Sequence, residues 1–168
     1  KKNLVLTGMM GSGKSSIGKS LSEMLNMEFA DTDNIIEKKL SLSVAEIFET
    51  KGESFFRKIE MEESLKLVEK KGFVISLGGG AFINDKLREK VKQTCFSVWL
   101  QLDVDEIFKR TKNNQKRPLL NINNSRGLLD KLYKEREKIY SIADFKIDCN
   151  NKDKNEIVEE IKKNYENN

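Results

Sequence analysis

The chain has 168 residues, 35% charged and 38% hydrophobic, with a formal net charge of +4 and no histidine. This composition excludes a disordered chain, and the lack of any apolar run of about 18 residues excludes a membrane-spanning helix. Without histidine, any chemistry has to use carboxylates, cations, magnesium and backbone groups, and the intermixed charges do not call for a nucleic acid. We expect a single cytoplasmic, monomeric domain over residues 1–168, with no nucleic-acid or membrane partner.

The first strong pattern is the glycine-rich segment GMMGSGKS at residues 8–15. It follows an apolar run and precedes a helical repeat, and G-x-x-x-x-G-K-S in that context predicts a loop that binds the phosphates of a nucleoside triphosphate. The lysine of such a loop reaches the outer phosphates and its last serine binds magnesium. A simple glycine-rich turn is the alternative. The candidate residues are Gly11, Ser12, Gly13, Lys14, Ser15 and Ser16.

Two acids, Asp31 and Asp33, follow the next short apolar run, residues 27–30. A parallel strand that ends here would bring both carboxylates to the edge of the sheet where phosphate binds, because ligands collect outside the carboxyl ends of such strands. The alternative is that one acid only caps a helix that begins at Asn34. Two acids so close together exceed the needs of one cap, so we expect them beside the triphosphate.

A capping box at residues 43–46, SVAE, predicts a short helix, and a longer helix is expected over residues 53–70. The apolar stripe of the longer helix is expected to contain Met61, Leu65 and Val68. One turn before that stripe lies Arg57. It either forms a structural ion pair with Glu60 or Glu53, or holds an anion at the edge of a pocket, and the pattern leaves both readings open.

Residues 73–77 form a nearly continuous apolar run, as expected of a strand buried on both faces, and three glycines follow at 78–80. Glycines at that place indicate a backbone that another group approaches closely, with a flexible hinge as the alternative. Two further strands are expected over residues 95–102 and 145–149. They contain Cys95 and Cys149, which we expect as buried free thiols.

Residues 112–124 interrupt the pattern with a polar segment that contains Lys116, Arg117 and the only proline. An insertion of this kind is typical of a mobile lid, where a kinase keeps a cation that closes over the transferring phosphate. A solvated basic loop is the alternative. The helix expected over residues 125–140 carries Arg136 within its apolar stripe, and an arginine on a buried stripe needs a partner.

Strands and helices alternate about five times along the chain, with the phosphate loop after the first strand. This pattern predicts an α/β protein with three layers, in which helices cover both faces of a five-stranded parallel sheet.

The set of segments resembles the shikimate kinase family, within the P-loop fold of nucleoside monophosphate kinases. The resemblance implies transfer of the ATP γ-phosphate to the 3-hydroxyl of shikimate, on the route to chorismate and the aromatic amino acids. It implies ATP and shikimate as partners, Mg²⁺ as cofactor, a shikimate-binding helical region at about 32–62 and a mobile lid at 112–124. The segments that carry it are GMMGSGKSSIG at 8–18, DTD at 31–33, FFRKIE at 55–60, SLGGGA at 76–81, KRPLL at 116–120, and Arg136 with Tyr140 and Ala143-Asp144.

On the acceptor side, the resemblance implies that Asp33 hydrogen-bonds the shikimate hydroxyls and orients or deprotonates the nucleophile. Arg57 and Arg136 would hold the shikimate carboxylate, for which the forked donors of arginine are well suited. The backbone of the glycine run, Gly78, Gly79 and Gly80, would lie close to the ring.

On the nucleotide side, the resemblance implies that Ser15 binds magnesium directly and that Asp31 is an outer-sphere magnesium carboxylate. Lys14 and Arg117 would act on the phosphates as catalytic cations, and Arg110 would lie near adenine. The alternatives are another small-molecule P-loop kinase, such as a gluconate or nucleoside monophosphate kinase, a catalytically silent nucleotide-binding module, and a nucleic-acid-binding ATPase.

Overall fold

The structure is a computed structural model that describes residues 1–111 and 125–168. Five strands form one sheet in the order β2-β3-β1-β4-β5, and every neighbouring pair is parallel. The predicted α/β class with a five-stranded parallel sheet is therefore confirmed. The predicted lid at 112–124, with Lys116 and Arg117, lies outside the described residues. The strands are β1 (Asn3–Thr7), β2 (Glu28–Asp31), β3 (Phe73–Ser76), β4 (Cys95–Gln101) and β5 (Phe145–Asp148).

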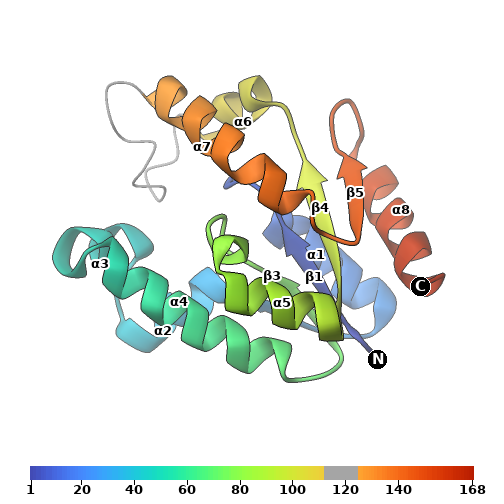
Figure 1. The fold of residues 1–168 in the computed structure, drawn as a ribbon. Coiled ribbons are helices and arrows are strands. Elements are labelled where there is room, and N and C mark those ends of the chain that lie inside the picture. Colours follow the sequence, from blue (N-terminus) through green and yellow to red (C-terminus); the bar gives the residue numbers. More distant parts are fainter. Residues whose placement is uncertain (112–124) are drawn as a thin grey trace.

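Helices cover both faces of this sheet, as predicted (Figure 1). The crossover from β1 to β2 and the crossover from β3 to β4 run in opposite directions, so right-handed connections place α1 and α5 on opposite faces. Helix α8 packs beside α1, and α4 packs beside α5. The helices are α1 (Lys14–Leu25), α2 (Thr32–Leu40), α3 (Val44–Lys51), α4 (Glu53–Val68), the short 3₁₀ helix η1 (Ala81–Ile83), α5 (Asp85–Thr94), α6 (Val104–Thr111), α7 (Ser125–Tyr140) and α8 (Lys154–Glu166).

The junction between β2 and α2 differs slightly from the prediction. Helix α2 begins directly after the strand, and Asp31 is its N-cap, with a side chain that accepts a hydrogen bond from the Asn34 N–H at 3.2 Å. Asp31 therefore caps a helix, but one that begins at Thr32 instead of Asn34, and capping is not its only contact because it also meets Ser15 of the phosphate loop. Asp33 is left in the first turn of the helix, and the carboxyl edge of the sheet holds both acids.

A second, smaller apolar cluster holds α2, α3 and α4 together outside the main core. Each fully buried side chain of this kind stabilises the fold by about 1.5–3 kcal/mol. The capping box at Ser43 and Glu46 forms as predicted and begins α3. This cluster makes the three helices a firm support for the residues that α4 carries. Its buried members are Ile36, Ile47, Phe56 and Ile59.

The predicted apolar stripe of α4 is wrong in detail. Met61 and Leu65 are only half-buried, whereas Glu60 and Glu63 are buried. The reason is that α4 packs on two sides, against α2 and α3 on one and against α5 on the other, so its buried surface is wider than one stripe. The buried carboxylates have cationic partners, since Glu63 pairs with Lys39 at 2.6 Å.

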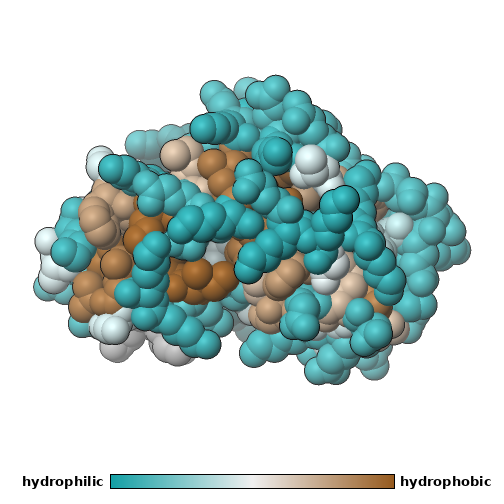
Figure 2. Space-filling view, turned by 90° about the horizontal axis from the view of Figure 1, so that it is seen from below, coloured by the Kyte–Doolittle hydropathy of each residue, from teal (hydrophilic) through white to brown (hydrophobic). Residues whose placement is uncertain are grey.

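Hydrophilic residues cover most of the face shown in Figure 2, with apolar residues visible between them. In the described part of the chain, the large exposed apolar side chains are Met24 on α1, Phe55 on α4 and Ile142 in the turn after α7. No described helix has the length and apolar composition that a membrane span needs. Cys95 and Cys149 are buried free thiols, as predicted, and burial raises the pKa of Cys149 to about 11.

Candidate active site

The glycine-rich loop joins β1 to α1, and its shape depends on glycine at defined positions. Gly11 has a φ of 80°, and a Cβ atom there would lie 2.2 Å from Cγ2 of Thr111 on α6. Gly13 has a φ of 98° and caps the N-terminus of α1 without a side-chain bond. The first backbone N–H groups of α1 therefore stay open toward the loop, and the helix dipole favours an anion there.

Two side chains of the loop have geometry that suits a bound phosphate. The Lys14 Nζ folds back over the loop and donates to the carbonyl oxygens of Gly8 at 2.8 Å and Met9 at 2.9 Å. The Ser12 hydroxyl is buried and has no hydrogen-bond partner among the described residues. A buried hydroxyl without a partner costs free energy, which an anionic oxygen in the loop would recover.

The two predicted metal residues are in direct contact. The Ser15 hydroxyl donates to Oδ2 of Asp31, across the gap between α1 and β2. An alcohol oxygen and one carboxylate are the kind of donors that Mg²⁺ takes, since it fills its other positions with phosphate oxygens and water. Within residues 1–111 and 125–168 there is no cluster of three or more His, Cys, Asp or Glu that would hold a metal by itself.

The glycine run after β3 is the point where the predicted acceptor-side groups meet. A Cβ atom at Gly78 would lie 2.8 Å from Oδ1 of Asp33 and 2.8 Å from Oε2 of Glu60. The same construction gives 3.3 Å from Gly79 to Nη1 of Arg136, and 2.5 Å from Gly80 to Nη1 of Arg57. Close approach by other groups, which the sequence predicted for this run, therefore comes from charged side chains at all three glycines, and at Gly79 also from the Met10 backbone nitrogen at 3.2 Å.

Thr32 fixes the start of the glycine run, and the sequence analysis did not identify it. Its buried hydroxyl accepts a hydrogen bond from the Gly78 N–H at 2.9 Å and lies 3.4 Å from the carbonyl oxygen of Ser76. The only signal in the sequence was weak, namely the position of a threonine between two acids at the end of a strand. Thr32 thereby ties β2 to the loop that follows β3.

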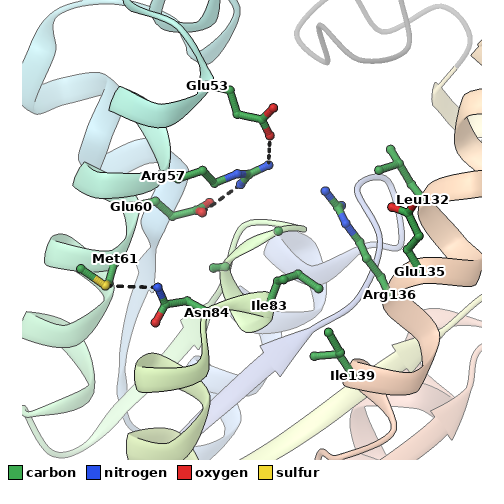
Figure 3. A pocket seen from close by; sticks show the side chains of 12 residues that line it. Glu53, Arg57, Glu60, Met61, Ile83, Asn84, Leu132, Glu135, Arg136 and Ile139 are labelled. Carbon is green, nitrogen blue, oxygen red and sulfur yellow. Dashed lines mark hydrogen bonds and ion pairs between the residues drawn. The ribbon is translucent and has the colours of Figure 1, made fainter.

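A cavity of about 550 Å³ opens beside the glycine run, between α4 and α7. Figure 3 shows Arg57 and Arg136 on opposite walls, with both guanidinium groups directed into the space between the two helices. The structure therefore brings together the two arginines that stood in unusual positions in the sequence. Gly80, Ala81 and Ile83 line the same cavity, as do the carboxylates of Glu53, Glu60 and Glu135.

Arg57 is held by carboxylates on its own helix. Its Nη1 lies 2.9 Å from Oε1 of Glu60, and its Nη2 lies 3.4 Å from Oε2 of Glu53. The ring of Phe56 lies 5.4 Å from the guanidinium carbon, close enough for a cation–π contact. Arg57 thus forms the structural ion pair and also faces the pocket. The reading in which it holds an anion there stays a prediction.

Glu60 is an unusual group in this wall because its side chain is only 4% exposed. Burial raises the pKa of its carboxyl group above the ordinary value, and the neighbouring Arg57 opposes that rise. The charge of Asp33 raises the pKa of Glu60 further. The negative charge of one carboxylate beside Gly78 therefore disfavours a negative charge on the other.

Arg136 differs from Arg57 in its partners. The residue is only 7% exposed, and in the described part of the chain its buried Nη1 has no hydrogen-bond partner. A buried cation with an unused donor is costly unless an anion approaches it. The atom of Arg136 that lacks a partner in the described residues is therefore Nη1, which faces the glycine run.

A second cavity, of about 330 Å³, lies on the phosphate-loop side of the glycine run. Gly78 and Gly79 line it, whereas Gly80 lines the larger cavity. Arg110 reaches its rim from α6, where it pairs with Glu106 at 3.1 Å. The remaining lining residues include Gly11, Gly13, Lys14, Ser15, Ser16, Asp31 and Asp33, so every described residue assigned to the nucleotide side except Ser12 lines it. Arg117 lies outside the described residues.

Comparisons of the sequence with a family model and with known proteins point to the same family. A family model described as shikimate kinase matches residues 10–166. A shikimate kinase from Sulfurihydrogenibium sp. (strain YO3AOP1) is 41% identical over 160 residues, which cover 95% of each chain. A shikimate kinase from Bartonella quintana is 36% identical over 167 residues, which cover 99% of this chain and 80% of the relative.

Solved structures of shikimate kinases also resemble this chain. A shikimate kinase from Acinetobacter baumannii in complex with shikimate superposes with a TM-score of 0.92 at 35% identity, covering 95% of this chain and 90% of that one. The enzyme from Aquifex aeolicus gives 0.83 at 39% identity, covering 95% and 93%. A gluconokinase from Sinorhizobium meliloti gives 0.62 at 19% identity, which shows a shared fold and no more.

Proposed function

The chain belongs to the shikimate kinase family, and we propose that its two cavities divide the two substrates of that reaction between them. The family transfers the γ-phosphate of ATP to the 3-hydroxyl of shikimate, giving ADP and shikimate 3-phosphate. In this proposal the 330 Å³ cavity receives the ATP phosphates and the 550 Å³ cavity receives shikimate. The observation that carries the proposal is the convergence of Arg57 and Arg136 on one cavity beside the glycine run.

We assign the shikimate carboxylate to the two arginines. Arg136 supplies a buried donor that has no partner in the described residues, and Arg57 approaches from the opposite wall. Charge-assisted hydrogen bonds of this kind contribute about 1.5–3 kcal/mol each. The carboxylate then fixes one end of the ring, and the glycine run limits how far the ring can move toward the phosphate loop.

We assign the reacting hydroxyl to Asp33. Its carboxylate lies at Gly78 and lines the cavity of the phosphate loop, so it can accept a hydrogen bond from a hydroxyl that faces the γ-phosphate. In the reaction the hydroxyl oxygen forms a bond to phosphorus while the bond to the leaving ADP oxygen breaks. Asp33 orients the hydroxyl and can take its proton, and the catalysis rests mainly on positioning and charge neutralisation.

On the nucleotide side we assign the phosphates to the backbone of residues 11–16 and to Lys14. Ser15 and Asp31 fit Mg²⁺, which would neutralise charge on the phosphate oxygens when bound. We assign Arg117 to the transferring phosphate and Arg110 to the adenine side, where it lines the rim of the cavity. Asp31→Asn should raise the Mg²⁺ concentration needed for half-maximal rate, and an unchanged Mg²⁺ dependence would remove Asp31 from this role.

The acceptor can be tested directly by comparing turnover on shikimate, gluconate and a nucleoside monophosphate. We expect turnover on shikimate to exceed the other two by orders of magnitude. Gluconate also carries a carboxylate that the arginine pair could hold, but Asp33 beside the triple glycine favours shikimate. Turnover on gluconate that equals or exceeds that on shikimate would overturn the assignment, and so would ATP binding without transfer to any acceptor.

We extend the proposal to a monomeric enzyme of the cytoplasm made of one domain over residues 1–168. Light scattering after size exclusion should give a mass close to 19.4 kDa. Twice that mass at micromolar concentration would contradict the monomer.

A further inference from the structure

Tyr140, the last residue of α7, is fully buried at the carboxyl edge of the sheet. Its ring packs beside Trp99 of β4, with 5.8 Å between ring centroids. Its hydroxyl donates a hydrogen bond of 2.5 Å to the carbonyl oxygen of Gly79, and Sδ of Met9 in the phosphate loop lies 3.7 Å away. One side chain therefore contacts both the glycine run and the phosphate loop.

The peptide bond that Tyr140 contacts is the boundary between the two cavities. Gly79 lines the cavity of the phosphate loop, and the next residue, Gly80, lines the acceptor cavity. The peptide group is planar, so its carbonyl and N–H point in opposite directions. A bond that fixes the Gly79 carbonyl therefore also fixes the direction of the Gly80 N–H.

The same peptide group is tightly surrounded on its other sides. A Cβ atom at Gly79 would lie 3.2 Å from the Met10 nitrogen of the phosphate loop and 3.3 Å from Nη1 of Arg136. Arg136 and Tyr140 are four residues apart on α7, so they lie on one face of that helix. A rotation of this peptide would therefore shift its position relative to Arg136 and relative to the phosphate loop at the same time.

We propose that Tyr140 is a positioning residue that holds the peptide between Gly79 and Gly80, and so sets the distance between the acceptor and the γ-phosphate. The inference rests on the proposed function of the two cavities and adds a residue to it. Tyr140 lines neither cavity, so in this proposal it acts through the glycine backbone.

The hydroxyl keeps its proton, and so can donate, at neutral pH. Burial raises the pKa of Tyr140 to about 12, and the nearby Arg136 opposes that rise without cancelling it. The proton that reaches Gly79 is therefore held more firmly than that of an exposed tyrosine.

The test compares Tyr140→Phe with Tyr165→Phe. Tyr165 also donates a 2.5 Å hydrogen bond to a backbone carbonyl, that of Lys2, but it lies on α8 and lines neither cavity. Each variant keeps its ring and loses one hydroxyl, so each should lower Tm by a few degrees at most. The measurements are Tm, ATP affinity without acceptor, and kcat and KM for shikimate, all at a temperature below both melting transitions.

We expect Tyr140→Phe to lower kcat/KM for shikimate by about five- to tenfold, which corresponds to the free energy of one hydrogen bond. Most of the loss should be in kcat, and ATP affinity should be unchanged. Tyr165→Phe should keep the kinetic constants of the unchanged protein. Equal kinetics for both variants, with a shift in Tm alone, would overturn the positioning role. A protein that does not phosphorylate shikimate even without substitution would instead overturn the proposed function, so the two failures are distinguishable.

Discussion

Replacing Arg136 with methionine should separate substrate binding from stability. The substitution keeps an unbranched apolar stem of similar length and removes the guanidinium group, whose buried Nη1 has no hydrogen-bond partner within the described residues. The proposed ligand carboxylate would lose at least one charge-assisted bond. Removing one member of a buried charge pair costs about 2–5 kcal/mol, and about 3 kcal/mol corresponds to about a 100-fold rise in Kd for shikimate.

The same structure predicts that this change leaves the fold intact. Arg136 has an unused buried donor within the described residues, and removing it favours folding, but its charge also stabilises the buried Glu60 carboxylate, so the two effects oppose and Tm should change by only a few degrees. Arg57→Met should behave differently, because Glu60 would lose the cation 2.9 Å away and remain buried. An uncompensated buried charge costs about 3–5 kcal/mol, although protonation of Glu60 would recover part of that, and each kcal/mol lowers Tm by about 2–4 °C at this size.

The assay is calorimetric titration of shikimate into Arg136→Met, Arg57→Met and the matched control Arg126→Met, together with Tm for each. Arg126 lies on the same helix as Arg136, but its side chain is 41% exposed and pairs with Asp105 and Asp130. The control should bind shikimate normally. A Kd for Arg136→Met within threefold of the unchanged protein would refute the carboxylate assignment, and a large fall in its Tm would refute the argument from the unpaired donor.

Three further substitutions test the proposed roles. Burial raises the pKa of Glu60, so its contribution to stability falls as pH rises from about 4.5 through the raised value, and Glu60→Gln should remove that fall from a plot of Tm against pH. Gly11→Ala should abolish ATP affinity, because the added methyl group would collide with Thr111. The control is Gly72→Ala, which has a similar φ of 81° but open space around the added methyl group, and it should lose only about 1–2 kcal/mol of stability. Equal ATP binding by the two variants would contradict this. Arg117→Ala should lower kcat about 10³-fold if it acts on the transferring phosphate, and an unchanged kcat would leave it a surface cation.

The fold could be predicted because its signals are local. The apolar run before the three glycines, the capping box at Ser43 and the loop at residues 8–15 each constrain their own segment, and their alternation specifies a parallel sheet. The order of the strands and the buried face of α4 could not be predicted in this way. That face depends on which helices pack against it, so Glu60 is buried although the helical repeat placed Met61 on the apolar stripe.

The candidate site was predictable in its charged groups and less so in its supports. Arg136 was conspicuous because an arginine within an apolar stripe needs a partner, and the structure places it in one cavity with Arg57. Thr32 and Tyr140 gave no comparable signal, since their contacts with Gly78 and Gly79 join residues 46 and 61 positions apart. Such contacts arise only when β2, β3 and α7 are assembled.

The most direct test of the account is to follow the reaction of the purified protein with MgATP by phosphorus NMR, with and without shikimate. We expect one equivalent of a new phosphate monoester at the 3-position of shikimate for each ADP, and almost no ADP when shikimate is left out. Release of ADP and free phosphate at the same rate with and without shikimate would contradict it.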